Sequence, residues 1–219
     1  MAEEGSKPRE REGHTEYTRG TLSEADLKQD PFEQFADWLE AAVVSAVDEP
    51  TTMTLATSTL DGVPSARIVL IDEYGPEGFT FYTNYESRKG RELADNPRVA
   101  AVFFWPHLER QVRIEGAIEK LSAEASDAYH GRRAYKSQLA AWASQQSKRI
   151  DSRQALEDRM EALQAQYTPG NVPRPPHWGG FRLIPRSFEF WQGRAHRLND
   201  RFLYEKDEKG QWQTCRLAP

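Results

Sequence analysis

Residues 67–89 read RIVLIDEYGPEGFTFYTNYESRK and contain the pattern from which the fold can be predicted. Apolar residues dominate 68–71 and again 79–83, and the glycines between these two runs indicate a turn. The stretch therefore predicts two paired strands, at 65–71 and 79–83. Ser87 is a favourable N-cap residue, so we expect a helix over 87–95 that Asn96 and Pro97 terminate.

The start of this predicted helix carries an unusual pair of cations, Arg88 and Lys89. Unpaired N–H groups give a helix N-terminus a partial positive charge, so acidic side chains are normally favoured there. Two cations at this place are explained if an anion, most simply a phosphate, binds at the helix start. The alternative is that both are solvated surface cations, tolerated at small cost.

The composition is that of a folded protein with a polar surface. The chain has 219 residues, of which 38% are hydrophobic and 11% aromatic, and a formal net charge of −5. This length and composition fit one sizeable domain with its own core. The negative charge argues against general nucleic-acid binding, which normally needs a basic stripe.

Several classes of protein are disfavoured by what the sequence lacks. No apolar run approaches the roughly 18 residues that cross a membrane, and the N-terminus has no apolar signal-peptide centre, so we expect a cytoplasmic protein without a membrane partner. Cys215 is the only cysteine, and the five histidines show no HxxxH or HExxH spacing, so no metal is expected. Neither a GxGxxG nor a GxxxxGK[ST] loop is present, so side chains and a helix start must hold any phosphate.

The order of the predicted elements indicates an α+β fold organised round an antiparallel sheet or barrel. Residues 1–13 are charged and are expected to form a mobile arm, with a single domain over 14–219. A helix begins at Pro31, and strands are expected at 51–58, 65–71, 79–83, 98–105 and 111–121. Helices at 123–135, 137–147 and 152–167 follow, and a proline-rich connector at 169–176 leads to strands at 181–184, 187–192, 201–205 and 212–216.

Tyr129, Arg133 and Ser137 recur at intervals of four residues. If one helix extends across all three, they lie on one face of it. A guanidinium between two hydroxyl groups is suited to binding a phosphate ester. An ordinary solvated helix face is the alternative interpretation.

Ten blocks of sequence, in this order, resemble those of the pyridoxine/pyridoxamine 5'-phosphate oxidase family: RIVLI, FYTN, SRKGREL, NPRVA, ERQVRIEG, AWASQQS, WGGFR, FEFWQG, HRLNDRFLY and RLAP. The resemblance extends from about Tyr17 to Pro219. It implies a split β-barrel that binds FMN, in a homodimer with two FMN molecules at its interface. It also implies oxidation of pyridoxamine 5'-phosphate or pyridoxine 5'-phosphate to pyridoxal 5'-phosphate, with O2 reduced to H2O2.

The same resemblance implies which residues bind FMN. Arg88 and Lys89 match the family's phosphate-binding dipeptide, which would account for the cations at the helix start. The full set of matching cofactor positions is Arg67, Ile68, Val69, Leu70, Ile71, Tyr82, Thr83, Arg88, Lys89, Gln111, Gln146, Ser147, Trp191 and Arg201.

On the substrate side the match is less complete. Tyr129, Arg133 and Ser137 match the residues that hold the substrate phosphate, and Arg197 matches the arginine that covers the substrate ring, for which we expect a catalytic role. The chain departs from the family at three further places. It has Asp72 in place of a lysine, Asn199 in place of a histidine, and His14-Thr15 before Glu16-Tyr17 in place of Arg-Arg/x.

Asp72 is the most consequential departure, because a carboxylate facing a phosphate replaces attraction by repulsion. Alternatively, Asp72 points to solvent or pairs with a nearby arginine. Asp72, Asn199 and Tyr17 are included among the expected substrate-binding residues.

The leading hypothesis is an FMN-dependent oxidase of B6 vitamer phosphates. A second keeps the flavin but changes the substrate to an unphosphorylated aromatic acid, as in related enzymes of phenazine biosynthesis, which also lack the lysine. Retention of Tyr129, Arg133 and Ser137 argues against that substrate. A third hypothesis, a protein that binds FMN or pyridoxal phosphate without turnover, rests on the three departures.

Overall fold

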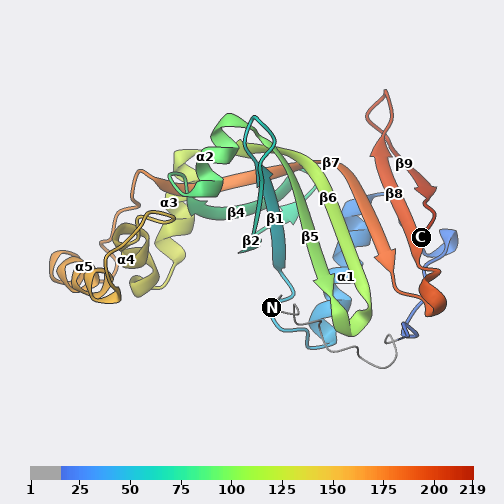
Figure 1. Ribbon diagram of the computed structural model, residues 1–219, viewed down its shortest axis with the longest axis horizontal. Helices are drawn as coiled ribbons and strands as arrows, with labels where there is room; N and C mark the ends of the chain where they lie inside the picture. Colours follow the sequence, from blue (N-terminus) through green and yellow to red (C-terminus); the bar gives the residue numbers. More distant parts are fainter. Residues whose placement is uncertain (1–15) are drawn as a thin grey trace, which may run out of the picture.

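The computed structural model describes residues 16–219, so the predicted mobile arm at 1–13, together with His14 and Thr15, lies outside the described residues. The strands described form one nine-stranded sheet in which every pairing is antiparallel. Its main path runs β2-β1-β5-β6-β7-β4-β3, while β8 pairs with β7 and β9 pairs with β8 (Figure 1).

The elements largely follow the sequence-based expectations and confirm an α+β fold on an antiparallel sheet. The strands are β1 (Thr52–Ser58), β2 (Pro64–Leu70), β3 (Tyr74–Gly75), β4 (Gly78–Asn84), β5 (Arg98–Trp105), β6 (Arg110–Lys120), β7 (Trp178–Gln192), β8 (Asp200–Lys206) and β9 (Trp212–Arg216). The α-helices are α1 (Pro31–Val44), α2 (Arg88–Asp95), α3 (Ala123–Arg132), α4 (Tyr135–Ala143) and α5 (Arg153–Gln166). Residues 16–219 also contain three 3₁₀ turns: η1 (Glu24–Asp26), η2 (Pro106–Leu108) and η3 (Ala195–Arg197).

The sheet curls until it almost closes on itself. β2 stands at one end of the strand order and β4 stands next to the other end, yet these two strands contact each other. They are not joined by a ladder of backbone hydrogen bonds, so an opening remains between them. This is the split barrel that the resemblance implies.

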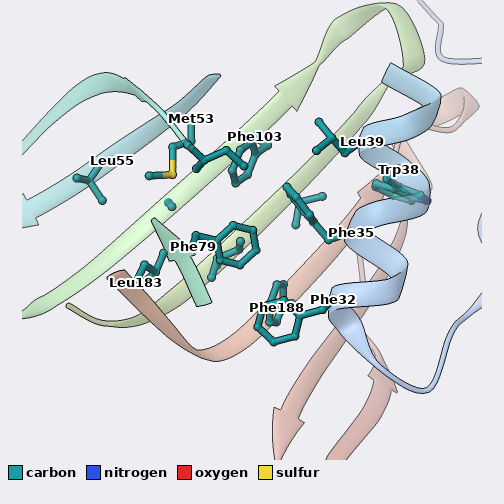
Figure 2. Close-up of a cluster of buried hydrophobic side chains, with 14 of the residues drawn as sticks. Phe32, Phe35, Trp38, Leu39, Met53, Leu55, Phe79, Phe103, Leu183 and Phe188 are labelled. Carbon is teal, nitrogen blue, oxygen red and sulfur yellow. The ribbon is translucent and has the colours of Figure 1, made fainter. Parts of the chain in front are cut away.

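Helix α1 closes the barrel over an aromatic core. Figure 2 shows Phe32, Phe35, Trp38 and Leu39 projecting from this helix towards side chains of the sheet. Phe35 is fully buried, and its ring centroid lies 4.9 Å from those of both Phe79 on β4 and Phe103 on β5. The core therefore ties α1 to strands from distant parts of the chain.

One prediction about the strands was wrong. The expected strands at 181–184 and 187–192 are a single strand, β7, because a bulge carries the chain past Pro185. The register of β6 against β7 shifts between Glu115 and Gly116. The other edge of β7 pairs first with β4 and then, beyond the bulge, with β8.

The break between two middle helices was also placed wrongly. Helix α3 ends at Arg132, and Arg133 has the extended angles φ −69° and ψ 149°. The side-chain amide of Gln138 on α4 donates to the last carbonyls of α3, at 2.8 Å from the oxygen of His130. This tertiary cap ends α3 early. Tyr129, Arg133 and Ser137 therefore do not share one helical face.

Gly90 allows the first turn of α2 to pack on the turn before it. A Cβ atom at Gly90 would lie 2.1 Å from the carbonyl oxygen of Tyr85, whereas one at Gly131 in α3 would meet nothing within 4 Å. We expect Gly90→Ala to lower the free energy of unfolding, measured in urea, by about 2 kcal/mol or more. Gly131→Ala is the matched control and should raise it by up to about 1 kcal/mol. Equal effects of the two substitutions would contradict this role for Gly90.

Candidate functional site

A cavity of about 360 Å³ lies in the opening between β2 and β4. Both strands contribute to its wall, as do the first turn of α2, the helices α3 and α4 and the start of β7. The lining residues are Ile68, Val69, Leu70, Tyr82, Thr83, Asn84, Lys89, Tyr129, Arg133, Ala140, Ala141, Ser144, Gln146 and Trp178. Nine of the residues that the sequence predicts to bind the cofactor or the substrate therefore line this one cavity.

Lys89 is the most unusual of these residues, because its ammonium group is buried without a carboxylate partner among the described residues. Its side chain donates to Thr83 Oγ1 and to Gln146 Oε1, each at 2.9 Å, and both partners are neutral. Burial, followed by the nearby charge of Arg67, lowers the pKa of Lys89 to about 8. A buried cation with neutral partners is costly, and an incoming anion would remove that cost.

The helix start itself is built as predicted. Ser87 caps α2, with its hydroxyl oxygen accepting from the N–H of Gly90 at 3.2 Å and donating to the carbonyl of Asn84 at 2.7 Å. Of the two cations that follow, Arg88 already pairs with Glu92, Nε to Oε1 2.8 Å. Of these two, Lys89 is therefore the cation without a carboxylate partner in residues 16–219.

Glu92 is a site residue that the sequence reasoning missed. Its carboxylate, 5% exposed, lies 3.5 Å from Arg67 Nη2 and accepts hydrogen bonds from Ser65, at 2.6 Å, and from Thr57. Burial opposes its ionisation, but these hydroxyl donors and Arg88 outweigh burial and hold the pKa of Glu92 at about 2. The spacing of Arg88 and Glu92, four residues apart on one helix, was the available signal. Glu92 therefore fixes Arg67 and Arg88, two of the three arginines that were predicted to bind the cofactor.

Three aromatic rings form another wall of the cavity. Tyr82 and Tyr129 stack with centroids 3.6 Å apart and planes at 2°, and Trp178 stacks 5.7 Å from Tyr82. Burial and the charge of Asp72 raise the pKa of Tyr82 to about 12, and burial likewise raises that of Tyr129. Both phenols therefore remain hydrogen-bond donors at neutral pH.

Arg133 contributes a second cation without a carboxylate partner in the described part of the chain. Its guanidinium carbon lies 4.6 Å from the ring centroid of Trp178, and its Nη1 is buried with no hydrogen-bond partner. A buried guanidinium N–H normally has an acceptor. The cavity thus holds two unpaired cationic groups, Lys89 and Arg133.

Several predicted residues lie close to this cavity but do not line it. Ile71 is buried in the core, and Ser137 and Ser147 belong to the segments that flank the lining residues of α4. Asp72 does not point free into solvent: its Oδ2 accepts from Arg132 Nη2 at 3.3 Å. The alternative in which Asp72 pairs with a nearby arginine is the one observed.

A second group of predicted residues gathers at the other end of the sheet. Gln111, Trp191 and Arg201 stand side by side on β6, β7 and β8, and the ring of Tyr17 packs edge-on against Trp191 at 5.5 Å. Arg201 Nε donates to Glu189 Oε1 at 2.8 Å, which raises the pKa of Arg201. Arg197 and Asn199 lie in the turn between β7 and β8.

The two groups are far apart within one chain. Trp178 begins β7 and belongs to the cavity, whereas Trp191 lies near the end of the same strand. Thirteen residues of strand correspond to roughly 40 Å along its path. Figure 1 shows β8 and β9 at one side of the molecule and α3, α4 and α5 at the other. One copy of the chain therefore does not bring the predicted residues together.

Residues 16–219 contain neither a metal-ligand cluster nor a helix suited to crossing a membrane. No three His, Cys, Asp or Glu side chains there are grouped so that they could hold a metal ion. No helix in the same range has the length and apolar character required to cross a membrane.

Comparison with known families gives two matches that together span most of the chain. Residues 39–167 match the model described as pyridoxamine 5'-phosphate oxidase. Residues 178–219 match the model described as the pyridoxine 5'-phosphate oxidase C-terminal dimerisation region.

Curated relatives agree with these matches. The pyridoxine/pyridoxamine 5'-phosphate oxidase of Burkholderia lata is 55% identical over 205 residues, and that of Gloeothece citriformis is 52% identical over 203 residues. Each alignment covers 93% of this chain and 95% of the relative.

Two solved structures have the same fold. PhzG from Burkholderia lata, in complex with tetrahydrophenazine-1-carboxylic acid, is 33% identical with a TM-score of 0.84, over 89% of this chain and 95% of that one. A pyridoxamine 5'-phosphate oxidase-related, FMN-binding protein from Nostoc punctiforme is 18% identical with a TM-score of 0.70, over 88% and 100%. The predicted fold class is confirmed.

Glu92 should make the stability of the protein depend on acid pH. Because folding lowers its pKa from 4.5 to about 2, its contribution is present above pH 4.5 and is lost as the pH falls towards 2. We expect Glu92→Gln to lower the free energy of unfolding at pH 7 by about 2–3 kcal/mol and to flatten its decline in acid. Urea unfolding between pH 2.5 and 7 measures both effects.

Glu157→Gln is the matched control, because Glu157 is also paired with an arginine, Arg153, but both side chains are exposed. This exchange should change the free energy of unfolding by less than about 0.5 kcal/mol. Identical pH profiles for wild type and Glu92→Gln would contradict the role given to Glu92.

Proposed function

Because the chain belongs to the pyridoxamine 5'-phosphate oxidase family, we propose that it oxidises pyridoxamine 5'-phosphate or pyridoxine 5'-phosphate to pyridoxal 5'-phosphate. One observation carries this proposal: the cavity between β2 and β4 contains two unpaired cationic groups, Lys89 and Arg133. Two anion-binding groups in one cavity suit two phosphates. We assign the cofactor phosphate to Lys89 and the substrate phosphate to Arg133.

FMN is the cofactor that the family and the FMN-binding relative support. The residues present fit it, since the buried ammonium of Lys89 needs an anion and the capped start of α2 lies beside it. Bound beside Lys89, FMN would supply the two-electron redox chemistry, with the C4' carbon of the substrate as hydride donor and O2, reduced to H2O2, as the final acceptor. For the amine, the balanced reaction consumes pyridoxamine 5'-phosphate, O2 and water and gives pyridoxal 5'-phosphate, ammonia and H2O2.

The protein's own residues bind and orient the reactants. Lys89, with Thr83 and Gln146 as neutral partners, holds the cofactor phosphate, while Arg133 and the phenol of Tyr129 donate to the substrate phosphate. The stacked rings of the cavity wall exclude water from the reacting groups. The proposed reaction needs no strong base from this part of the chain.

The second group of residues would come from another copy of the chain, in a homodimer. Trp191, Arg197 and Arg201 all fall within 178–219, the region that matches the family's dimerisation model. β2, which lines the cavity, also exposes apolar side chains: Ile68 is 61% and Leu70 52% exposed. Apolar side chains exposed beside a site favour an interface there. Arg197 of the second copy is the residue we propose to cover the substrate ring.

An oxidase of unphosphorylated aromatic acids is the second candidate. The similarity to PhzG and the presence of Asp72 favour it. Against it, the chain is 55% identical to the pyridoxine/pyridoxamine oxidase of Burkholderia lata and 33% identical to PhzG of the same species. The unpaired Arg133 also suits a phosphate better. A binding protein without turnover and a cytoplasmic location both stay predictions from the sequence.

Activity measurements distinguish these candidates. We expect protein purified with FMN to be yellow and to release one H2O2 for each pyridoxal 5'-phosphate formed from pyridoxamine 5'-phosphate. Unphosphorylated pyridoxamine, which has no anion for Arg133, and tetrahydrophenazine-1-carboxylic acid, which has a carboxylate in place of the phosphate, should both be turned over at least about tenfold less efficiently in kcat/KM. Faster turnover of the phenazine compound would support the second candidate, and flavin binding without peroxide would support the third.

Mixing two inactive variants tests whether one site uses two copies of the chain. Lys89→Met removes the cofactor group on the cavity side, and Arg197→Ala removes a residue of the second group. In a mixed dimer one site carries both substitutions and the other carries neither, so random exchange should restore about a quarter of wild-type activity. Co-purification through a tag on one variant confirms exchange. No recovery despite exchange would show that both groups act within one copy.

A further inference from the structure

Asp72 and Arg132 form an ion pair beside the cavity. Asp72 lies two residues beyond the end of β2 and Arg132 is the last residue of α3, so the pair joins two elements that contribute to the cavity wall. The distance from Arg132 Nη2 to Asp72 Oδ2 is 3.3 Å. The side chain of Asp72 is 22% exposed and that of Arg132 is 63% exposed.

The pair is adjacent to the residues assigned to the substrate phosphate. The guanidinium carbon of Arg132 lies 5.3 Å from the ring centroid of Tyr129, and the next residue in the chain is Arg133. The negative charge of Asp72 acts on the phenols of both Tyr82 and Tyr129. Asp72 and Arg132 are therefore close enough to this part of the cavity to influence an anion bound there.

We propose that Arg132 is a further binding residue for the substrate phosphate and that Asp72 is a positioning residue that acts through Arg132. The inference rests on the proposed function. A guanidinium has five N–H donors, and the bond from Nη2 to Asp72 leaves most of those on Arg132 free. Because Arg132 neutralises Asp72, the carboxylate does not present an unpaired negative charge to the phosphate.

This arrangement explains how an acidic residue is compatible with an anion site. An exposed ion pair contributes little to folding, so stability alone gives no reason for a carboxylate here. A carboxylate that holds a flexible arginine side chain reduces the entropy that the arginine loses when it binds a ligand. Asp72 then promotes binding of the phosphate by positioning Arg132, although the negative charge of Asp72 itself repels the phosphate.

A double-mutant cycle on the FMN-loaded protein tests the proposal, with Arg132→Ala, Asp72→Asn and the double variant titrated with pyridoxal 5'-phosphate and with pyridoxal. Arg132→Ala should raise the Kd for pyridoxal 5'-phosphate about tenfold, since it removes a cation and uncovers Asp72. Adding Asp72→Asn to Arg132→Ala should lower the Kd for pyridoxal 5'-phosphate about threefold again, because it removes the carboxylate charge that Arg132 no longer neutralises. Asp72→Asn alone should instead weaken binding about twofold. The Kd for pyridoxal should not change.

The sign of the Asp72→Asn effect is the decisive result. If Arg132→Ala binds pyridoxal 5'-phosphate as tightly as wild type, or if Asp72→Asn acts in the same direction in both backgrounds, the proposal is wrong. In steady-state kinetics, Arg132→Ala should raise KM for pyridoxamine 5'-phosphate and leave kcat nearly unchanged. Arg153→Ala is the matched control, because it removes an exposed arginine that is paired with Glu157 on α5. It should alter neither Kd nor KM.

The wild-type protein separates failure of the inference from failure of the proposed function. If wild type prefers pyridoxal 5'-phosphate to pyridoxal and Arg132→Ala keeps that preference, only the role of Arg132 is overturned. If wild type shows no such preference and oxidises no phosphorylated vitamer, the proposed function fails, and the inference fails with it.

Discussion

The pairing of β7 with three other strands is the constraint on which the rest of the structure depends. One edge of β7 pairs with β6 on both sides of the bulge, while the other edge pairs with β4 before the bulge and with β8 after it. The change of partner allows the sheet to curl back towards β2 and leaves the opening that becomes the cavity. The same change sends Gln111, Trp191 and Arg201 to the opposite end. Sheet topology thus divides the candidate site into two parts.

The cations in and around the cavity are of two kinds: some are paired with a carboxylate and others are not. Glu92 holds Arg67 and Arg88, and Asp72 holds Arg132, so these arginines are fixed by the protein itself. Lys89, which is buried, and Arg133, whose Nη1 is buried, have no such carboxylate within residues 16–219. Side chains that are fixed before a ligand arrives lose less entropy on binding. The unpaired cations contribute the larger electrostatic free energy when an anion binds, because it gives them the partner that the protein does not provide.

Most of the fold and the cavity side of the candidate site could be predicted from the sequence, because the patterns that indicate them involve residues that are close together in the chain. The cap at Ser87, the alternating strands and the unusual Arg88-Lys89 pair depend on residues that are neighbours in the chain. The missed features depend on residues far apart. Helix α3 ends early because Gln138 of the next helix caps it, and Glu92 is buried because hydroxyl groups of β1 and β2 surround it. The partner of Asp72 lies 60 residues further along the chain.

The bulge at Arg186, next to Pro185, also fixes the number of residues in β7. Side chains of successive strand residues point to opposite faces of the sheet. One residue inserted into β7 beyond the bulge would therefore move every later side chain of this strand to the opposite face. Glu189, which holds Arg201, would then face where Phe190 now packs in the core. Insertions and deletions should therefore be excluded along this strand during divergence of the chain, while the exposed turn at Asp207–Gly210 between β8 and β9 remains free to vary in length.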